Sequence, residues 1–176
     1  MMPTVHGEAL AHRVRLAANE FDRAGQAYQQ FLPDGRSYQS IPVFSMDISY
    51  KRLAALIALF QVRDIGEAAK LLGVTKAAVY NSVRQMEELL DLSLFDREPG
   101  GVAPTGFCGI LARHTKLAFA EIRHALEDIA SLDGITQGSV IIGTLPYTRP
   151  YLTPRAINRL LKAHPQSDVA TQEGPY

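Results

Sequence analysis

The stretch Ile65–Phe95, with the sequence IGEAAKLLGVTKAAVYNSVRQMEELLDLSLF, constrains the fold of this chain more than any other segment. Its first residues supply the small and apolar positions of a short helix: Ala68, Ala69 and Leu72. Gly73 then predicts a break, because glycine reaches the left-handed backbone conformation that a sharp turn needs. Thr75 follows as an expected N-cap, since its hydroxyl can accept a hydrogen bond from a free amide of the next helix. Two helices joined in this way are typical of a helix-turn-helix.

The second helix of this segment has one apolar and one polar face. Its apolar residues recur at helical spacing and are predicted to be buried: Val79, Val83, Met86 and Leu90. The start of the helix and its open face carry small, polar and cationic residues: Thr75, Lys76, Ala77, Tyr80, Asn81 and Arg84. A helix of this kind fits the major groove of DNA, and we expect these residues to face bases or phosphates. An ordinary helical hairpin, in which the alanines and Gly73 serve close packing alone, is the structural alternative.

The flanking sequence extends the pattern on both sides. Upstream, apolar residues at helical spacing predict a helix that completes a three-helix core: Leu53, Leu56, Ile57 and Phe60. Downstream, apolar residues surround the turn signal Pro99-Gly100-Gly101 and predict a two-stranded wing: Leu94, Phe95 and Val102. A long helix is expected from about Pro104 to Ser131.

Taken together, these residues resemble the LysR-type transcriptional regulators. The family pattern has two alanines, a leucine three residues later, a Ser or Thr opening the recognition helix and an Ala-Val inside it. A hydrophobe-Glu pair, a Leu and then Leu-Phe follow before the wing. The matching positions here are Ala68, Ala69, Leu72, Thr75, Ala78, Val79, Met86, Glu87, Leu90, Leu94 and Phe95. The resemblance covers roughly Asp47 to Tyr176.

The resemblance implies a sequence-specific, DNA-binding transcriptional regulator that is dimeric and controlled by a small-molecule effector. Its partners would be double-stranded DNA, the effector and a second copy of the chain, in a homodimer or in a tetramer of the full-length protein. Arg97 matches the first of two arginines that the family commonly carries in the wing, and it is expected to contact the DNA backbone. The alternative function is a winged-helix interaction module that has lost DNA binding and pairs with a full-length regulator.

Five positions depart from the family pattern. Lys76 and Ala77 replace the usual Gln and Pro or Ser, and Tyr80 replaces a small Ser or Thr, so base recognition should differ from that of a typical member. Gly100 stands where the wing usually has its second arginine, which should weaken sequence-independent binding. Cys108 stands where a glycine is expected near the start of the long helix.

The long helix carries an apolar stripe that we expect to pair with the same helix of a second chain. The residues predicted to form this homodimer contact are Leu111, Ala118, Ile122, Ala125 and Ile129.

A weak internal repeat links this helix to the start of the chain. At an offset of 101 residues, Pro3-Thr4 aligns with Pro104-Thr105, and six further positions are identical. In the first copy these are Leu10, Ala11, Leu16, Ala17, Glu20 and Ala24; in the second they are Leu111, Ala112, Leu117, Ala118, Glu121 and Ala125. Residues 1–31 are therefore predicted to form an amphipathic helix, as a remnant of an upstream winged-helix unit. The rival explanations are chance similarity of two alanine-rich helices and a misassigned start, with Met46 as the true initiator.

After Asp133-Gly134 the pattern changes to strand, helix, strand. Gly138–Gly143 is predicted to be a buried strand, residues 154–164 a helix and residues 167–172 a second strand. This arrangement resembles the opening of the family's effector domain, whose fold is like that of periplasmic binding proteins. Ligands in such folds bind beyond the carboxyl ends of strands, so Thr144, Tyr147 and Thr148 are the candidate effector-binding residues. They could equally cap and turn the chain.

Composition sets broad limits on function. The 18 basic and 18 acidic residues of this 176-residue chain cancel, so any DNA contact must come from a local stripe of charge. The single cysteine, Cys108, suits a reducing cytoplasm, and no apolar run approaches the ~20 residues that cross a bilayer. The five histidines lack ligand spacing, and no phosphate-binding loop or nucleophile motif is present. We therefore expect a cytoplasmic protein without metal, cofactor or enzymatic activity.

The expected fold is mainly α: a winged helix-turn-helix with a long linker helix, then the incomplete start of an α/β domain like that of periplasmic binding proteins. The predicted order is an amphipathic helix (1–31), a loop (32–46), the DNA-binding domain (47–106), the linker and dimerisation helix (107–133) and a truncated effector-binding domain (134–176). Such a short strand-helix-strand piece buries little apolar surface, so we expect the chain to be a fragment.

Overall fold

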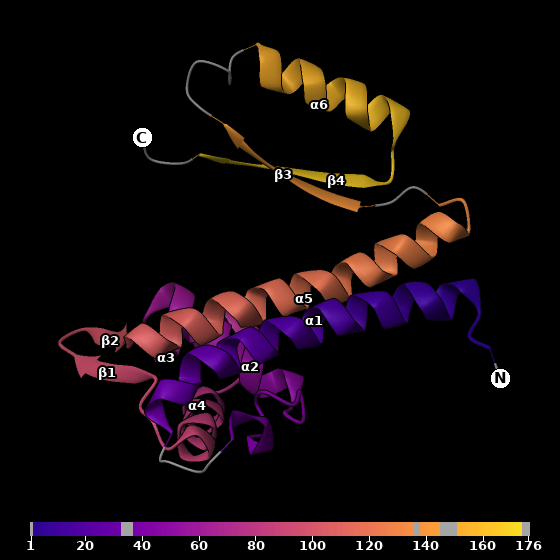
Figure 1. Ribbon diagram of the computed structural model, residues 1–176. Coiled ribbons are helices and arrows are strands. Elements are labelled where there is room, and N and C mark those ends of the chain that lie inside the picture. The colour runs from indigo at the N-terminus through magenta and orange to yellow at the C-terminus, as the bar shows by residue number, and fades with distance from the viewer. Residues whose placement is uncertain (1, 33–36, 136–137, 145–150, 174–176) are drawn as a thin grey trace. The chain divides into compact units, whose positions relative to one another are not determined.

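The computed structural model describes residues 2–32, 37–135, 138–144 and 151–173 (Figure 1). The chain divides into two compact units, Val14–Ile122 and a second unit made of Met1–Arg13 with Arg123–Tyr176. The long helices α1 (Val5–Tyr28) and α5 (Gly106–Leu132) each contribute to both units.

The first unit contains the predicted helix-turn-helix. Helices α2 (Tyr50–Val62), α3 (Ile65–Leu72) and α4 (Lys76–Leu90) contact one another pairwise. Asp64 begins α3 by accepting a hydrogen bond from the Glu67 amide at 2.8 Å, a cap that the sequence argument did not include. Gly73 ends α3 in the left-handed conformation at φ 65°, and the Thr75 hydroxyl accepts from the Ala78 amide at 3.2 Å. The turn and the cap predicted from the sequence are confirmed.

The predicted wing is an antiparallel hairpin of β1 (Phe95–Glu98) and β2 (Gly101–Pro104). Gly100 takes a positive φ of 93° in the turn between the strands, a conformation that glycine adopts without strain. Hereafter α2, α3, α4, β1 and β2 together, Tyr50–Pro104, are called the head.

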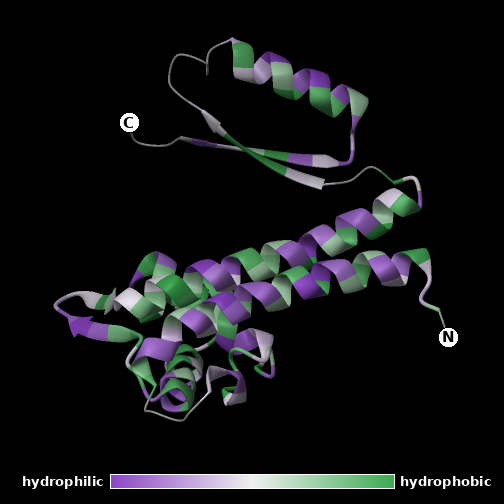
Figure 2. Ribbon diagram, viewed as in Figure 1, coloured by the Kyte–Doolittle hydropathy of each residue, from purple (hydrophilic) through white to green (hydrophobic). Residues whose placement is uncertain are grey.

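Helix α1 packs antiparallel to α5 within each unit. In the first unit, Tyr28 near the end of α1 lies against Phe107 at the start of α5, with ring centroids 4.9 Å apart. In the second unit, the Arg13 guanidinium bonds the Asp128 carboxylate at 2.7 Å. Figure 1 shows the two helices side by side, and Figure 2 shows hydrophilic and hydrophobic residues alternating along both, as amphipathic helices require.

The core of the first unit is larger than the predicted DNA-binding domain of residues 47–106. Its main cluster joins residues of the head to apolar residues of α1 and α5, which include Ala17, Phe21, Ala24, Tyr28, Leu111 and Ala118. The segment predicted as a loop (32–46) also contributes, because Val43 and Phe44 are buried there. Burial of an aromatic side chain such as Phe21 stabilises a fold by roughly 1.5–3 kcal/mol. The N-terminal segment is therefore an integral part of this core.

The second unit holds β3 (Gly138–Thr144), α6 (Leu152–Ala163) and β4 (Ser167–Glu173). The two strands are parallel neighbours, as the strand-helix-strand pattern predicts. The prediction that β3 is buried is wrong: Val140 is 42% and Ile141 65% exposed. Apolar strands need a covering layer on each face, and the described part of this unit leaves most of β3 uncovered.

Candidate nucleic-acid interface

The exposed face of α4 carries the residues predicted to contact DNA. Val79, Val83, Met86 and Leu90 are buried, so the opposite face is turned to solvent. Residues from the start of α4 and along this face are all exposed: Thr75, Lys76, Ala77, Tyr80, Asn81 and Arg84. Thr75 has a structural task as well, because its hydroxyl caps the helix.

The wing lies beside this face and forms a groove with it. The groove has a volume of about 520 Å³, and Tyr80 and Arg84 line it from α4 while Arg97 lines it from β1. Lys76 and Asn81 are not among its lining residues. Glu87 and Glu98 also border the groove, so its charge is mixed. The structure thus brings together three of the predicted residues from segments that are separated in sequence.

Arg84 is held loosely on the surface of α4. Its Nε donates to Glu88 Oε1 at 2.9 Å, and both side chains are about 60% exposed, at 62% and 59%. Exposed pairs of this kind contribute little to stability. A phosphate or a guanine edge would therefore compete readily with Glu88 for the guanidinium.

Glu87, which the sequence indicated only as a match to the family pattern, has a structural role in the wing. Its Oε1 accepts hydrogen bonds from the amides of Leu94 at 2.8 Å and Phe95 at 3.3 Å. These amides lead into β1, so the carboxylate ties the recognition helix to the start of the wing. The hydrophobe-Glu pair of the family pattern was the signal that could have indicated this contact.

A second tie joins the wing to the end of α2. Arg63 adopts a left-handed conformation at φ 56° and its carbonyl accepts from the Val102 amide at 2.9 Å. Gly101 packs so closely against this carbonyl that a Cβ there would overlap it. The wing is therefore fixed at both strands, which sets the position of Arg97 relative to α4.

The predicted dimerisation stripe has a partner within the chain. Leu111, Ala118 and Ala125 are fully buried, and Leu111 and Ala118 share the core cluster with Ala17 and Phe21 of α1. Ile122 remains 39% exposed and Ile129 is half-buried. We expected this stripe to pair with the same helix of a second chain. In the structure α1 covers part of it, because α1 is amphipathic and long enough to lie along α5.

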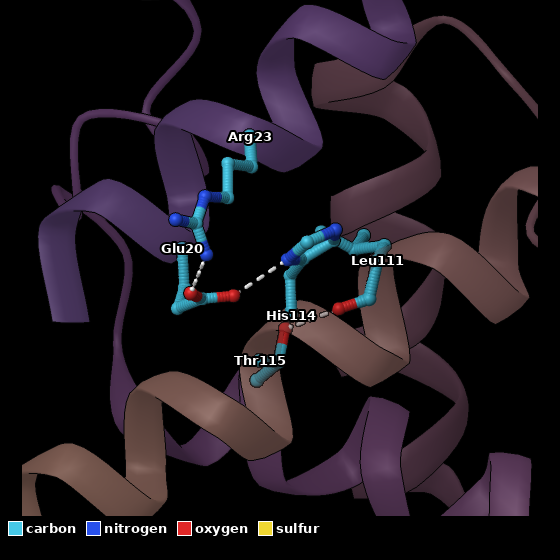
Figure 3. Close-up of polar contacts among 5 residues, drawn as sticks. All are labelled: Glu20, Arg23, Leu111, His114 and Thr115. Atoms are coloured by element: carbon cyan, nitrogen blue, oxygen red, sulfur yellow. Dashed lines mark hydrogen bonds and ion pairs between the residues drawn. The ribbon is translucent and has the colours of Figure 1, made fainter. Parts of the chain in front are cut away.

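A polar contact fixes the α1–α5 pairing in the first unit (Figure 3). Glu20, buried on α1, accepts from Arg23 through Oε1 at 2.5 Å, and its Oε2 lies 2.7 Å from His114 Nδ1 on α5. Thr115, the next residue of α5, is fully buried and donates its hydroxyl proton to the Leu111 carbonyl at 2.8 Å. The polar groups at this helix contact are thereby satisfied.

The predicted effector corner is described in part. Thr144 ends β3, is buried, and borders a cavity of about 740 Å³ together with residues of α6 and Thr171 of β4. Tyr147 and Thr148 lie outside the described residues. Among the described residues, Thr144 is thus the one predicted effector contact that lies at this cavity.

Other kinds of site receive no support within the described ranges. In these ranges no cluster of three or more His, Cys, Asp or Glu side chains could hold a metal ion. None of the helices described has the length and apolar character that crossing a membrane demands. Cys108 is buried, and this burial together with the charge of Glu87 raises its thiol pKa to about 12.

Known proteins share this arrangement. Residues 50–108 match the family of bacterial regulatory helix-turn-helix proteins of the lysR type. The chain is 29% identical over 126 residues to the transcriptional regulator GalR of Pseudomonas putida, a match that covers 72% of this chain and 32% of that protein. It is 31% identical over 130 residues to a probable RuBisCO transcriptional regulator of Cyanophora paradoxa, covering 72% and 39%.

A solved structure supports the fold. The crystal structure of a probable transcriptional regulator from Pseudomonas aeruginosa superposes with a TM-score of 0.50 at 24% identity, over 74% of this chain and 44% of that one. The present chain thus spans between about a third and two fifths of the length of the curated relatives named above. On the family match, the relatives and the winged helix-turn-helix itself, the chain belongs to the LysR-type transcriptional regulators.

Proposed function

We propose that the head is the sequence-specific DNA-binding part of a transcriptional regulator. The observation that carries this proposal is the exposed face of α4, which presents Lys76, Asn81 and Arg84 to solvent beside the Arg97 of the wing. An α-helix fits the major groove, while a flanking wing contacts phosphates. The relatives named above are transcriptional regulators, which supports the same reading of the site.

The complete protein, in this proposal, is controlled by a small-molecule effector bound in the domain that β3, α6 and β4 begin. Thr144 lines an open cavity at the carboxyl end of β3, the place where ligands bind in parallel α/β sheets. Tyr147 and Thr148 follow it in sequence and are proposed as further contacts. A homodimer of the complete protein, as the family resemblance implies, would provide two DNA-binding heads, joined through surfaces other than the part of the α5 stripe that α1 covers. The matched family is one of regulators and not of enzymes, and we propose a cytoplasmic location with double-stranded DNA as partner.

A fluorescence anisotropy titration of the chain with labelled duplex fragments of its own genome, at 50 and 200 mM salt, tests DNA binding. Wild-type affinity should fall steeply with salt, because Lys and Arg release counterions from the phosphates they contact. The double variant Lys76→Ala/Arg84→Ala should lose affinity and have a smaller salt slope. Arg159→Ala, an exposed change on α6, is the matched control and should bind as the wild type does. Salt-insensitive or absent binding by the folded wild type would instead favour the non-DNA-binding interaction module.

A further inference from the structure

Helices α1 and α5 begin in the same way. Thr4 Oγ1 accepts from the amide of Gly7 at 3.2 Å, and Thr105 Oγ1 accepts from the amide of Cys108 at 3.2 Å. Thr4 and Thr105, like Gly7 and Cys108, are related by the 101-residue offset of the sequence repeat. The carbonyls of both threonines also accept the next intrahelical bonds, from Glu8 and Gly109. The repeat therefore extends from the sequence to the local structure, because equivalent threonines make equivalent capping hydrogen bonds.

The contacts between the two helices are arranged about the centre of this repeat. Ala17 and Ala118 are equivalent positions, and both are buried. Glu20, which contacts His114, lies three residues after Ala17. The position equivalent to His114 is Arg13, which lies four residues before Ala17. Tyr28, which contacts Phe107, lies eleven residues after Ala17. The position equivalent to Phe107 is His6, which lies eleven residues before Ala17. Two equivalent helices that cross antiparallel at an equivalent position are related by an approximate two-fold axis.

The side chains at this crossing obey the same relation. One small apolar cavity of about 160 Å³ is bordered by two pairs of equivalent residues, Ala17 with Ala118 and Phe21 with Ile122, together with residues of the head and the segment before it. The bonded pair Glu20 and His114 has Glu121 and Arg13 as counterparts, and Arg13 likewise bonds a carboxylate across the two helices, that of Asp128 on α5. The apolar residues at the crossing are therefore paired as in a symmetric helix pair.

From these observations we propose that α1 is a built-in substitute for a second copy of α5, and that this chain closes its helix pair within one molecule. This pairing of α1 with α5 does not depend on whether the head binds DNA. A second chain that used the same face of α5 would have to displace Phe21, Ala24 and Tyr28, which are buried. Tyr28 also donates its hydroxyl proton to the Leu90 carbonyl and so attaches α1 to the end of α4.

Covalent connection favours α1 over a second chain. The end of α1 at Tyr28 and the start of α2 at Tyr50 are joined by a short segment that packs into the core through Val43 and Phe44. A tethered partner has an effective concentration on the order of millimolar, so a second chain at micromolar concentration is at a disadvantage of about a thousandfold for the same face. One chain then presents one head per helix pair.

Thiol cross-linking distinguishes pairing within a chain from pairing between chains. All variants carry Cys108→Ala, which removes the one native thiol, and are oxidised at micromolar concentration with a copper catalyst, because a disulfide can form between buried positions that a bulky reagent does not reach. The variant Ala17→Cys/Ala118→Cys should give an intrachain disulfide, seen as a faster-migrating monomer in non-reducing electrophoresis. Ala118→Cys alone should give no linked dimer. In an α5–α5 homodimer, Ala118 would meet its own copy at the two-fold axis, so a linked dimer from the single variant would overturn the proposal. A linked dimer from the double variant in place of the intrachain link would also overturn it.

Sedimentation velocity adds a measurement that needs no cysteine. The wild-type chain should be a monomer up to high micromolar concentration. Phe21→Asp should loosen α1 from α5 and produce dimers, whereas Leu10→Asp, at a position 44% exposed, should leave the monomer unchanged. The proposal would be contradicted if the wild type were a dimer that persists in Phe21→Asp and dissociates in Ile122→Glu. That result would show that α5 pairs between chains.

Discussion

The carboxylate of Glu20 on α1 lies 2.7 Å from the imidazole of His114 on α5, although 94 residues separate them in sequence. Both side chains are mostly buried, at 11% and 18% exposure. A contact of this kind selects one register between two helices, because a shift by one residue would separate the carboxylate from its partner on α5.

Replacing Glu20 should therefore destabilise the first unit. Glu20→Gln keeps the shape but removes the charge that bonds Arg23 and His114, at a cost of about 1–3 kcal/mol in the free energy of unfolding. Urea denaturation followed by circular dichroism measures the change. Glu98→Gln, an exposed change on β1, is the matched control and should cost almost nothing. Equal stability of the two variants would show that the Glu20 contact does not hold the helices.

Two adjacent glutamates of α4 should differ in their effect on the wing. Glu87→Ala removes the acceptor of the Leu94 and Phe95 amides, so both amides should exchange faster with deuterium. The DNA affinity of Glu87→Ala should also fall, because Arg97 is less well positioned when the wing is loosened. Glu88→Ala breaks the exposed pair with Arg84 and should leave wing exchange unchanged. Faster wing exchange in Glu88→Ala alone would contradict this assignment.

Arg84 and Arg97 should affect DNA binding in different ways. If Arg84 contacts a base edge, Arg84→Ala should cost roughly 1–3 kcal/mol of discrimination between cognate and altered sequences. If Arg97 contacts phosphates, Arg97→Ala should weaken all sequences about equally and reduce the salt slope by about 0.9. Competition titrations with a panel of duplexes measure both quantities. Unchanged binding of both folded variants would exclude this assignment.

The Arg13–Asp128 pair should give the second unit a dependence on acid pH. The hydrogen bond from Arg13 lowers the pKa of Asp128 below its ordinary value. A lowered pKa means that the pair stabilises the fold above about pH 4, where the carboxyl is ionised in both states, and that this contribution is lost as pH falls further. The melting temperature of Asp128→Asn should be below that of the wild type at pH 7 and converge with it toward pH 3.

The exposed Asp168 of β4 provides the control for this acid dependence. Asp168→Asn should melt with the wild type across the same pH range. A gap between Asp128→Asn and the wild type that stays constant down to pH 3 would show that the charge of Asp128 does not contribute.

The sequence by itself determined the local structure of the head. Gly73 and Thr75 mark the turn and the cap, and the spacing of Val79, Val83, Met86 and Leu90 defines the buried face of α4, because helix periodicity and capping depend on residues a few positions apart. The turn signal Pro99-Gly100-Gly101 likewise predicted the wing, whose two strands form on either side of it. The amphipathic helix at the start of the chain was likewise evident from its repeat of the long helix.

The tertiary structure alone decided which of these faces meet. The stripe of α5 was correctly identified as apolar. Its periodicity, however, could not show whether α1 or a second chain packs against it. Glu87 looked like a surface residue because its partners, the Leu94 and Phe95 amides, are reached only after the chain turns back at Asp91. The apolar composition of β3 indicated burial, but burial requires a covering layer, which spacing within a strand cannot supply. Local periodicity thus specifies a helix or strand and its apolar face, whereas the partner of that face depends on contacts between residues far apart in sequence.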